Sequence, residues 1–363
     1  MLSFVLPTRD RPDDLGQTAA AVAALGLADA ELVVVDNASS RAPELPRSIR
    51  GMPVRLIRLD ENLGAAARNV GAEAAVNPWL VMLDDDSAPI DSGIVDAVRG
   101  ADRDVGAIAG DIVLPDGSRE RGGLPEVFVG CGVAIRRELF LGLGGYDPSF
   151  GYYAEEYDLC AKLIAAGSRV GFDQRFRVLH RKVGAGRDFG LILQRLVRNN
   201  GWVIARHAPS VDRGHELGRM LGRYASIAQR EGVIDGFARG HAELRRSIDR
   251  QTRTPMSDDH WARFTGLAAV REALAAGLPA RARTAAIVAP GKGEHTVREA
   301  IAERGLIIVG DASSADVRII GTLSPGPMID AAASMAGDAR LVIPWPAADR
   351  MVRRASGRPV AAA

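Results

Sequence analysis

Apolar runs and helix-like stretches alternate through the first hundred residues of the chain. Each mainly apolar run is followed directly by a proline or an aspartate. Runs this short, bounded by turn residues, are typical of buried strands. The predicted strands are 2–6, 32–35, 54–59 and 79–83, with predicted helices at 14–25 and 64–76. This alternation has the pitch of βαβ units, so we expect one half of a doubly wound α/β sheet.

The pattern changes after residue 105, and each later part predicts a different structure. Short strands are predicted at 105–114, 127–135, 169–172 and 176–179, with a helix at 153–166. Residues 188–278 are almost entirely helical in pattern, and residues 284–343 return to alternating strands and helices. We therefore expect a first domain over 1–187, a helical extension over 188–280, a small α/β lobe over 281–352 and a tail over 353–363.

Composition and charge exclude several classes of protein. The 363 residues include 46 Lys and Arg against 45 Asp and Glu, a net charge of +1. A dedicated nucleic-acid binder usually has a strongly basic domain, so we expect no nucleic-acid partner. The chain has two cysteines, and no apolar run approaches the roughly 18–20 residues that span a bilayer. We expect a globular cytoplasmic protein.

Three consecutive aspartates are the most unusual local feature. Asp84, Asp85 and Asp86 follow the predicted strand 79–83 directly. Neighbouring carboxylates repel one another and lose solvation unless a cation joins them. A divalent cation such as Mg²⁺ or Mn²⁺ is a natural partner, and it normally completes its shell with water and substrate phosphates. The alternative is a solvated loop in which Asp86 or Asp91 caps the next helix.

Several runs, in order, share a pattern with a known family. In the first hundred residues they are VLPTRDRPDDL, VVVDNASS, NLGAAARNVGAEAA and WLVMLDDDSAP, followed by GCGVAIRRELFLGLGGYDPSFGYYAEEYDLCAKL and then His180. Together they resemble family 2 glycosyltransferases with the A-type nucleotide-diphospho-sugar fold, over about residues 2–182. The resemblance implies a Rossmann-like mixed sheet in this part of the chain, followed by the helical segment and the small C-terminal α/β lobe.

The resemblance also implies donor-binding residues. Pro7, Thr8 and Arg9 would form the loop under the nucleotide, and Asp36 would bind the base or ribose. The residues that would close over the nucleotide and diphosphate are Asn62, Gly64 and Arg68. Glycine allows a close approach of backbone to ligand, and an arginine fork suits base edges or phosphate oxygens. The alternative for residues 62–64 is an ordinary turn before a helix.

A metal site and a catalytic base follow from the same resemblance. Asp84 and Asp86 match the Asp-x-Asp signature of the family, in which the last Asp most directly binds the metal, and Asp85 would face the ribose or donor sugar. His180 matches a histidine that some members use as a further ligand for Mn²⁺ or Mg²⁺.

Glu155 and Glu156 match the acidic pair of the family, whose second acid is the general base. Glu156 is therefore our candidate, although Glu stands where Asp is commoner, which leaves the choice between the two open. The alternative is an acidic first turn favoured by the helix dipole.

The implied activity is that of a metal-dependent inverting glycosyltransferase. It would move a sugar from a nucleoside-diphosphate sugar, with UDP favoured, to a hydroxyl or amine of a glycan intermediate or specialised metabolite. The alternatives are a nucleotidyltransferase or sugar-nucleotide pyrophosphorylase, and a non-catalytic nucleotide-binding scaffold. A pyrophosphorylase would want a glycine-rich loop near the first strand, and residues 7–12 contain no glycine.

Two features of the second half of the chain remain outside this site. Pro290-Gly291-Lys292-Gly293 suggests a phosphate loop but lacks the spacing and the Ser or Thr of a Walker motif. The predicted helix around 217–230 has an apolar stripe flanked by arginines, which could lie on an anionic membrane or pack within the protein. The appended lobe is expected to serve interaction, homodimer formation or acceptor shaping.

Overall fold

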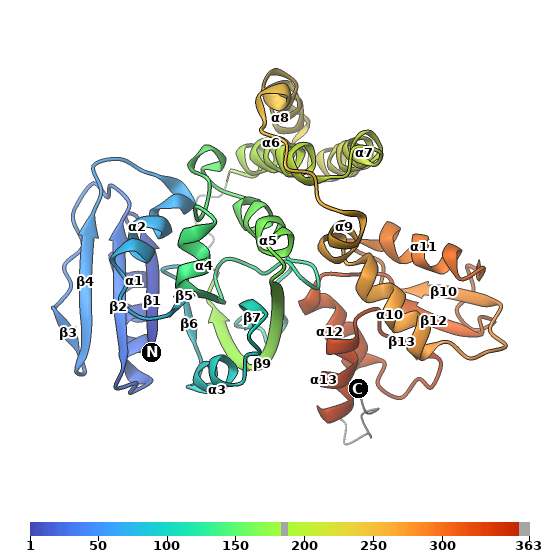
Figure 1. Ribbon diagram of the computed structural model, residues 1–363, viewed down its shortest axis with the longest axis horizontal. Helices are drawn as coiled ribbons and strands as arrows, with labels where there is room; N and C mark the ends of the chain where they lie inside the picture. Colours follow the sequence, from blue (N-terminus) through green and yellow to red (C-terminus); the bar gives the residue numbers. More distant parts are fainter. Residues whose placement is uncertain (183–187, 356–363) are drawn as a thin grey trace.

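The computed structural model describes residues 1–182 and 188–355, and Figure 1 shows their arrangement. Within these residues, nine strands form one mixed sheet in the order β3-β4-β2-β1-β5-β8-β7-β9-β6. The strands are β1 (Leu2–Thr8), β2 (Ala30–Asp36), β3 (Ser48–Ile49), β4 (Met52–Arg58), β5 (Trp79–Met82), β6 (Ser87–Pro89), β7 (Val105–Val113), β8 (Val133–Arg136) and β9 (Arg169–His180). The expected α/β class with a mixed sheet is confirmed.

The centre of the sheet is parallel and its far side is mixed. β1 runs parallel to β2 and to β5, with Leu2 opposite Ala30 and Trp79. β8 then runs antiparallel to both β5 and β7, and β9 runs parallel to β7. The carboxyl ends of β1 and β5 therefore lie side by side, which brings the segment after Thr8 next to the aspartates after Met82.

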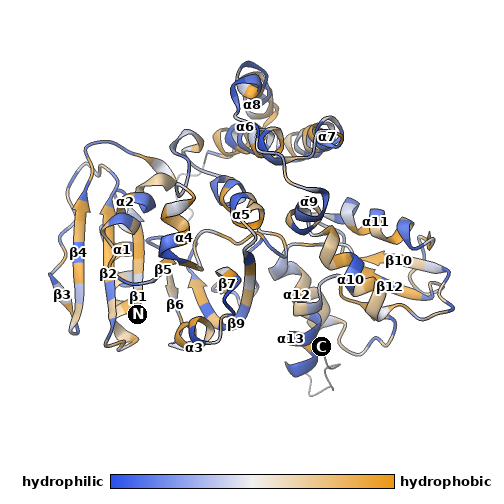
Figure 2. Ribbon diagram, in the orientation of Figure 1, coloured by the Kyte–Doolittle hydropathy of each residue, from blue (hydrophilic) through white to orange (hydrophobic). Residues whose placement is uncertain are grey.

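Helices cover both faces of the sheet because side chains alternate along the buried central strands. Leu6 and Leu32 pack on one face with α1 (Pro12–Ala24) and α3 (Gly93–Arg99). Val5 and Val33 pack on the other face with α2 (Ala67–Ala74), α4 (Arg137–Gly142) and α5 (Glu155–Ala165). Figure 2 shows the orange, apolar central strands between these helices.

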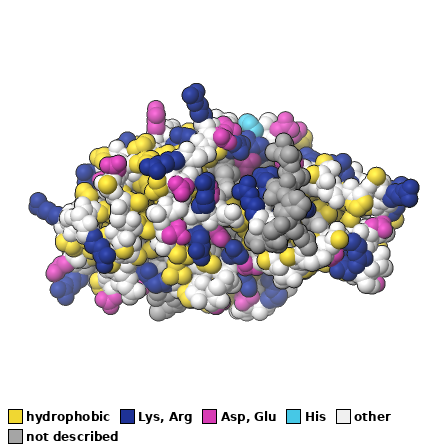
Figure 3. All heavy atoms as spheres, turned by 90° about the horizontal axis from the view of Figure 1, so that it is seen from below, with side chains coloured by type: hydrophobic (Ala, Val, Ile, Leu, Met, Phe, Trp, Pro, Cys, Tyr) yellow, Lys and Arg dark blue, Asp and Glu magenta, His cyan; other side chains and the backbone are white. Residues whose placement is uncertain are grey.

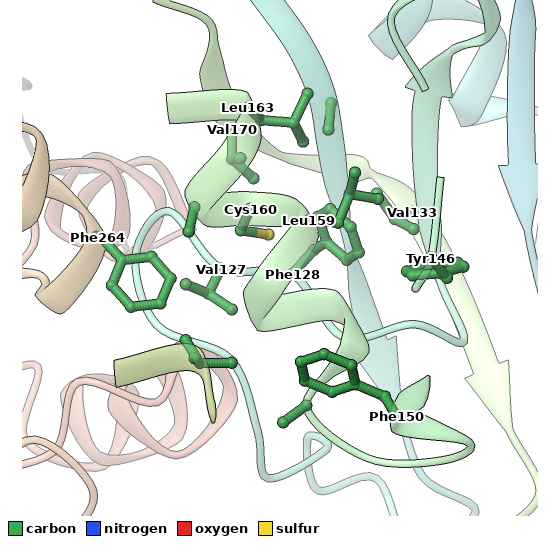
Figure 4. Close-up of a cluster of buried hydrophobic side chains, with 14 of the residues drawn as sticks. Val127, Phe128, Val133, Tyr146, Phe150, Leu159, Cys160, Leu163, Val170 and Phe264 are labelled. Carbon is green, nitrogen blue, oxygen red and sulfur yellow. The ribbon is translucent and has the colours of Figure 1, made fainter. Parts of the chain in front are cut away.

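Two strand predictions were wrong in detail. Of the apolar run 127–135, only residues 133–135 pair in the sheet, as part of β8, whereas Val127 and Phe128 fill the core beside α5. Figure 4 shows these two residues around Cys160 of that helix. The two strands predicted at 169–172 and 176–179 are one continuous strand, β9, which passes the polar residues between them with a register shift against β7.

The helical segment forms a layer beside α5. It comprises α6 (Phe189–His207), α7 (Arg213–Glu231) and α8 (Ile234–Ser247), followed by α9 (Asp258–Thr265) and α10 (Leu267–Gly277). Figure 1 shows α6, α7 and α8 together above α5. The apolar stripe of α7 is used within the protein, because Met220 and Tyr224 are buried in the core and Leu217, Leu221 and Ile227 pack against it. Packing within the protein therefore accounts for this stripe.

The C-terminal lobe has its own core. Over the described residues, its sheet has four parallel strands in the order β11-β10-β12-β13. These are β10 (Thr284–Val288), β11 (Ile307–Ile308), β12 (Val317–Ile320) and β13 (Leu341–Val342), with helices α11 (Glu294–Glu303), α12 (Pro325–Ser334) and α13 (Pro346–Ala355). Val270 and Leu274 of α10 belong to this core.

The predicted tail from 353 begins inside α13, and residues 356–363 lie outside the described part. In residues 1–182 and 188–355, no helix combines the length and apolar character needed to cross a bilayer. Figure 3 shows cationic and anionic side chains interspersed over one face, as expected from the balanced composition.

Close packing of α6 on α8 depends on glycine, so a methyl group there is expected to destabilise the protein. A Cβ on Gly240 would lie 2.4 Å from the backbone oxygen of Gln194. We expect Gly240→Ala to cost about 1–3 kcal/mol of unfolding free energy, measured by chemical denaturation. The control, Gly222→Ala on α7, has open space around its Cβ and should be neutral or stabilising. Equal stability of both variants would contradict this packing.

Candidate functional site

A polar cavity of ≈ 610 Å³ opens at the carboxyl ends of β1 and β5. Its walls come from the loop after β1, the aspartates after β5, the end of β9, the loop before α5 and the start of α6. The lining residues are Pro7, Thr8, Arg9, Arg11, Arg68, Asp84, Asp85, Asp86, Glu120, Tyr152, Tyr153, His180, Lys182, Asp188, Leu191, Ile192 and Arg195. This position is where open α/β sheets bind ligands.

Most of the residues proposed from the sequence meet in this cavity. Pro7, Thr8, Arg9, Arg68, the three aspartates and His180 all line it. Asp36, Asn62 and Gly64 are not among the described residues of its wall. Asp36 is fully buried and accepts a 3.0 Å hydrogen bond from the backbone N–H of Ser39, and Asn62 is exposed and accepts one from the N–H of Gly64.

Gly64 influences the cavity indirectly, through a close contact with the loop before α5. Its φ is 63°, and a Cβ there would lie 2.3 Å from the backbone oxygen of Gly151, in the loop before α5. The next residue, Ala65, donates a backbone hydrogen bond of 2.7 Å to the same oxygen. Glycine at this position lets two loops touch. The contact joins the segment before α2 to the loop that carries Tyr152 and Tyr153.

Cationic side chains of the protein itself accompany the three aspartates. Arg68 is buried and forms a short ion pair with Asp84, whose side chain is 39% exposed towards the cavity. Asp85 accepts hydrogen bonds from Thr8 at 2.9 Å and from Arg11 at 3.0 Å. Arg11 also lies 3.5 Å from Asp86. These cations offset part of the repulsion among the three aspartates, for which a metal was the expected partner. Arg11 was not predicted from the sequence.

His180 stands in the middle of a buried polar cluster. Its Nε2 lies 3.4 Å from Asp86, and its Nδ1 lies 2.8 Å from Glu120 and 3.7 Å from the Cys131 sulfur. Burial alone would lower the pKa of His180, but the hydrogen bonds to Asp86, Cys131 and Glu120 raise it to about 12. Glu120 in turn binds Lys182 at 2.8 Å.

Glu120 and Cys131 could not be recognised as site residues from the sequence, because the pairing of β7, β8 and β9 brings them to His180 from distant positions. Asp84, Cys131 and His180 each offer a ligand atom within 4.8 Å of the other two. A carboxylate oxygen and an imidazole nitrogen fit a divalent metal once His180 has lost its proton. The nitrogen and the thiol are poor ligands for Mg²⁺, so Mn²⁺ fits these residues better of the two expected ions.

The loop before α5 has a strained backbone that α6 holds in place. Tyr153 and Ala154 both have positive φ, 74° and 66°, a backbone conformation that residues other than glycine rarely adopt. The buried amide of Asn199 on α6 donates to the carbonyl oxygens of Phe150, Tyr152 and Tyr153 at 3.0, 2.9 and 2.6 Å. This amide fixes the loop and with it the start of α5, where both glutamates lie.

The two glutamates have different surroundings. One oxygen of Glu155 is buried with no hydrogen-bond partner among the described residues, and burial together with Glu156 raises the pKa of Glu155 well above its usual range. Glu156 lines a second cavity of ≈ 790 Å³, and burial raises its pKa while Lys292 and Arg68 oppose the rise. Tyr153 lines both cavities. The cavities therefore share a wall, and Glu156 faces the second.

The first half of the chain is similar to known proteins. Residues 3–159 match the model of glycosyl transferase family 2. An uncharacterized glycosyltransferase of Haemophilus influenzae is 25% identical over 190 residues, 45% of this chain and 62% of the relative. A glucosyl-dolichyl phosphate glucuronosyltransferase of Haloferax volcanii is 29% identical over 153 residues, 34% of this chain and 49% of the relative. The chain thus spans less than two thirds of these curated relatives.

Two solved structures are similar to this chain at low sequence identity. S. aureus TarS in complex with UDP-GlcNAc is 12% identical, with 84% of this chain and 92% of that chain covered and a TM-score of 0.49. A mannosyltransferase from Pyrobaculum calidifontis in complex with GDP-Man and Mn²⁺ is 18% identical, with 75% and 80% covered and a TM-score of 0.48. The family match and the mixed sheet confirm the A-type fold expected from the sequence.

Asp158 is expected to be essential for stability, because it fastens α5 to α6. It lies 2.9 Å from His207, 3.1 Å from Arg206 and 2.7 Å from Lys162. Burial alone would raise the pKa of Asp158, but the hydrogen bond from His207 and the charge of Lys162 hold it well below its usual range. Asp158→Asn should cost about 3–5 kcal/mol at pH 7.

The pH dependence of this stabilisation has a definite sign. A lowered carboxyl pKa stabilises the fold above the unfolded value of about 4, and the stabilisation is lost as the pH falls below it. The gap between wild type and Asp158→Asn, measured by urea denaturation, should therefore shrink from pH 7 to pH 3. Asp249→Asn, at an exposed site on the helical layer, is the control. A gap that does not change with pH would contradict the assignment.

Proposed function

We propose that the protein transfers a sugar from a nucleoside-diphosphate sugar to an acceptor, because residues 3–159 match the model of glycosyl transferase family 2. The favoured donor nucleotide is UDP. The acceptor group is a hydroxyl or amine of a glycan intermediate or specialised metabolite, and the reaction inverts the anomeric configuration. The observation that carries the proposal is the pair of cavities that meet at Tyr153, one with the aspartates and cations and the other with Glu156.

The first cavity has the charges that a nucleotide diphosphate requires. Arg9, Arg11 and Lys182 line it and present guanidinium or ammonium groups that bind phosphate oxygens. Arg68 is held against Asp84 and so positions that carboxylate. Asp36 has a buried oxygen without a hydrogen-bond partner among the described residues, which supports its proposed role towards the base or ribose. In our proposal Asn62 and Gly64 shape the neighbouring wall.

The residues that would hold a divalent metal are Asp84, Asp86 and His180, with Cys131 beside them. When bound, the ion would act as a Lewis acid that stabilises the leaving diphosphate. Glu120 orients the His180 ring through its 2.8 Å contact with Nδ1, which leaves Nε2 towards Asp86.

Glu156 is proposed as the general base. Its carboxylate takes the proton of the acceptor group as the acceptor oxygen or nitrogen bonds to the anomeric carbon and the bond to the diphosphate oxygen breaks. The products are the glycosylated acceptor and a nucleoside diphosphate. Burial raises the pKa of Glu156, so the carboxylate is a stronger base than an exposed glutamate. Acceptor and diphosphate occupy opposite sides of the sugar, so the configuration inverts.

Loss of the metal-facing carboxylate is expected to abolish metal-dependent donor binding. The measurement is the thermal shift produced by UDP, GDP, dTDP and CDP, each with and without Mn²⁺. Wild type should be stabilised most by UDP with Mn²⁺, less with Mg²⁺ and least with EDTA. Asp84→Asn should remove the dependence on Mn²⁺, whereas Asp249→Asn should retain it. The assignment is overturned if EDTA leaves nucleotide stabilisation unchanged in wild type.

Loss of the base is expected to stop transfer but not donor binding. Glu156→Gln should retain less than a tenth of wild-type release of nucleoside diphosphate from the nucleotide sugar, because the amide cannot accept the proton. The UDP-induced thermal shift should persist. Glu138→Gln, at an exposed position of α4, should behave as wild type. Retention of more than a tenth by Glu156→Gln would refute its role.

The reaction products distinguish the proposed transferase from the two alternatives, a nucleotidyltransferase or pyrophosphorylase and a non-catalytic scaffold. A nucleotidyltransferase or pyrophosphorylase would release pyrophosphate, which a coupled phosphate assay separates from nucleoside diphosphate. Metal-dependent nucleotide binding without turnover over a broad panel of sugars and acceptors would indicate a scaffold protein. Release of nucleoside diphosphate with formation of a glycosylated product supports the transferase.

A further inference from the structure

The second cavity is built jointly by the catalytic domain, the helical layer and the C-terminal lobe. Glu156 contributes from α5, Arg223 and Tyr224 from α7, and Lys292 from the loop after β10. The lobe is therefore part of the wall that faces the proposed base. The Pro290-Gly291-Lys292-Gly293 segment is therefore not placed as a nucleotide-binding loop would be. It borders the cavity of Glu156 and not the cavity of the aspartates.

The charge of this cavity is strongly unbalanced. Three cationic side chains, Arg121, Arg223 and Lys292, line it, and Glu156 is the single acidic residue among the described lining. Arg121 and Arg223 are exposed and Lys292 is half-buried, and over residues 1–182 and 188–355 none of the three forms an ion pair. The ammonium group of Lys292 instead makes a short contact with the hydroxyl of Tyr157 and lies 4.6 Å from the centre of its ring.

Other cations at the junction of domain and lobe are paired. Arg119 binds Asp111 and Asp330, both at 2.7 Å, and Arg263 binds Glu126 at 2.6 Å. The chain therefore supplies carboxylates where cations serve only to join its parts. The three cations without an ion pair among the described residues line this cavity, where an anion from outside the chain can reach them.

A half-buried ammonium without a counter-ion is costly. Burial and the charge of Arg223 lower the pKa of Lys292 to about 7, against a smaller opposing effect of Glu156. An anion bound between Lys292 and Arg223 would remove this cost.

The position of the lysine is fixed by bonds on both sides of the loop. Ser324 accepts from the backbone N–H of Gly122 at 2.9 Å and donates to its carbonyl oxygen at 2.6 Å. The carbonyl oxygen of Lys292 accepts a hydrogen bond of 2.7 Å from Leu323.

We propose that the acceptor carries a phosphate group, which Lys292 of the lobe binds together with Arg121 and Arg223 while the reacting hydroxyl or amine faces Glu156. Three cations match the charge of a phosphate better than that of a single carboxylate. This inference rests on the proposed function, because the phosphate-bearing ligand is an acceptor only if the protein transfers a sugar. Binding of the phosphate group can nevertheless be measured without turnover.

The test compares three small probes that differ in one group. Binding of glycerol 1-phosphate, glycerate and glycerol to the full chain is measured by calorimetry with saturating UDP and Mn²⁺, so that the first cavity is filled. We expect glycerol 1-phosphate to bind most tightly. Lys292→Met should weaken it about tenfold, the loss of one charge-assisted hydrogen bond, and Lys292→Arg should restore much of the affinity. Arg230→Met, exposed on α7 and outside the cavity, is the matched control.

The outcomes separate this inference from the proposed function. Equal affinity for glycerol and glycerol 1-phosphate, or no effect of Lys292→Met, overturns the phosphate site. Tighter binding of glycerate than of glycerol 1-phosphate also overturns it in favour of a carboxylate acceptor. If phosphate binding depends on Lys292 but no nucleotide sugar is ever turned over, the anion site stands and the transferase proposal fails. UDP affinity should be the same in wild type and Lys292→Met.

Discussion

The buried amide of Asn199 on α6 holds the segment between Phe150 and Ala154, with further hydrogen bonds from Arg198 and Ala65. Two consecutive residues there have positive φ, and the Asn199 side chain donates to three carbonyl oxygens of the segment. Such a backbone persists only where its surroundings determine it. Tyr153, which borders both cavities, and the two glutamates at the start of α5 take their positions from this segment. The helical layer is thus part of the active-site framework, although no element of it belongs to the matched family segment.

Charge compensation is the second organising feature. The acids on the donor side have cations of the chain beside them: Arg68 at Asp84, Arg11 at Asp85 and Asp86, and Lys182 at Glu120. Five cationic and five acidic residues line this first cavity, whereas three cations and one glutamate line the second. The almost neutral total charge therefore conceals two cavities with different electrostatic character.

The sequence predicted what short apolar runs and local motifs can encode. The central strands follow from such runs, and the aspartates and His180 meet as expected at one edge of the sheet. The run 127–135 misled because apolar residues in a loop can fill a core as well as those in a strand. Glu120 and Cys131 escaped because only the pairing of distant strands brings them to His180. The position of Lys292 could not be predicted, because residues 290–293 match no complete motif that would assign them to a site.

Two hydrogen bonds between Ser324 and Gly122 are among the few polar contacts that join the C-terminal lobe to the first half of the chain. The cavity with the aspartates lies in the first half of the chain, whereas part of the wall of the second cavity is supplied by a lobe with its own core. A lobe of this kind can vary in sequence, or be replaced, without disturbing the nucleotide-binding half. Under the proposed function, inheritance of the lobe would set which molecules receive the sugar, while the chemistry of transfer would be inherited with the sheet.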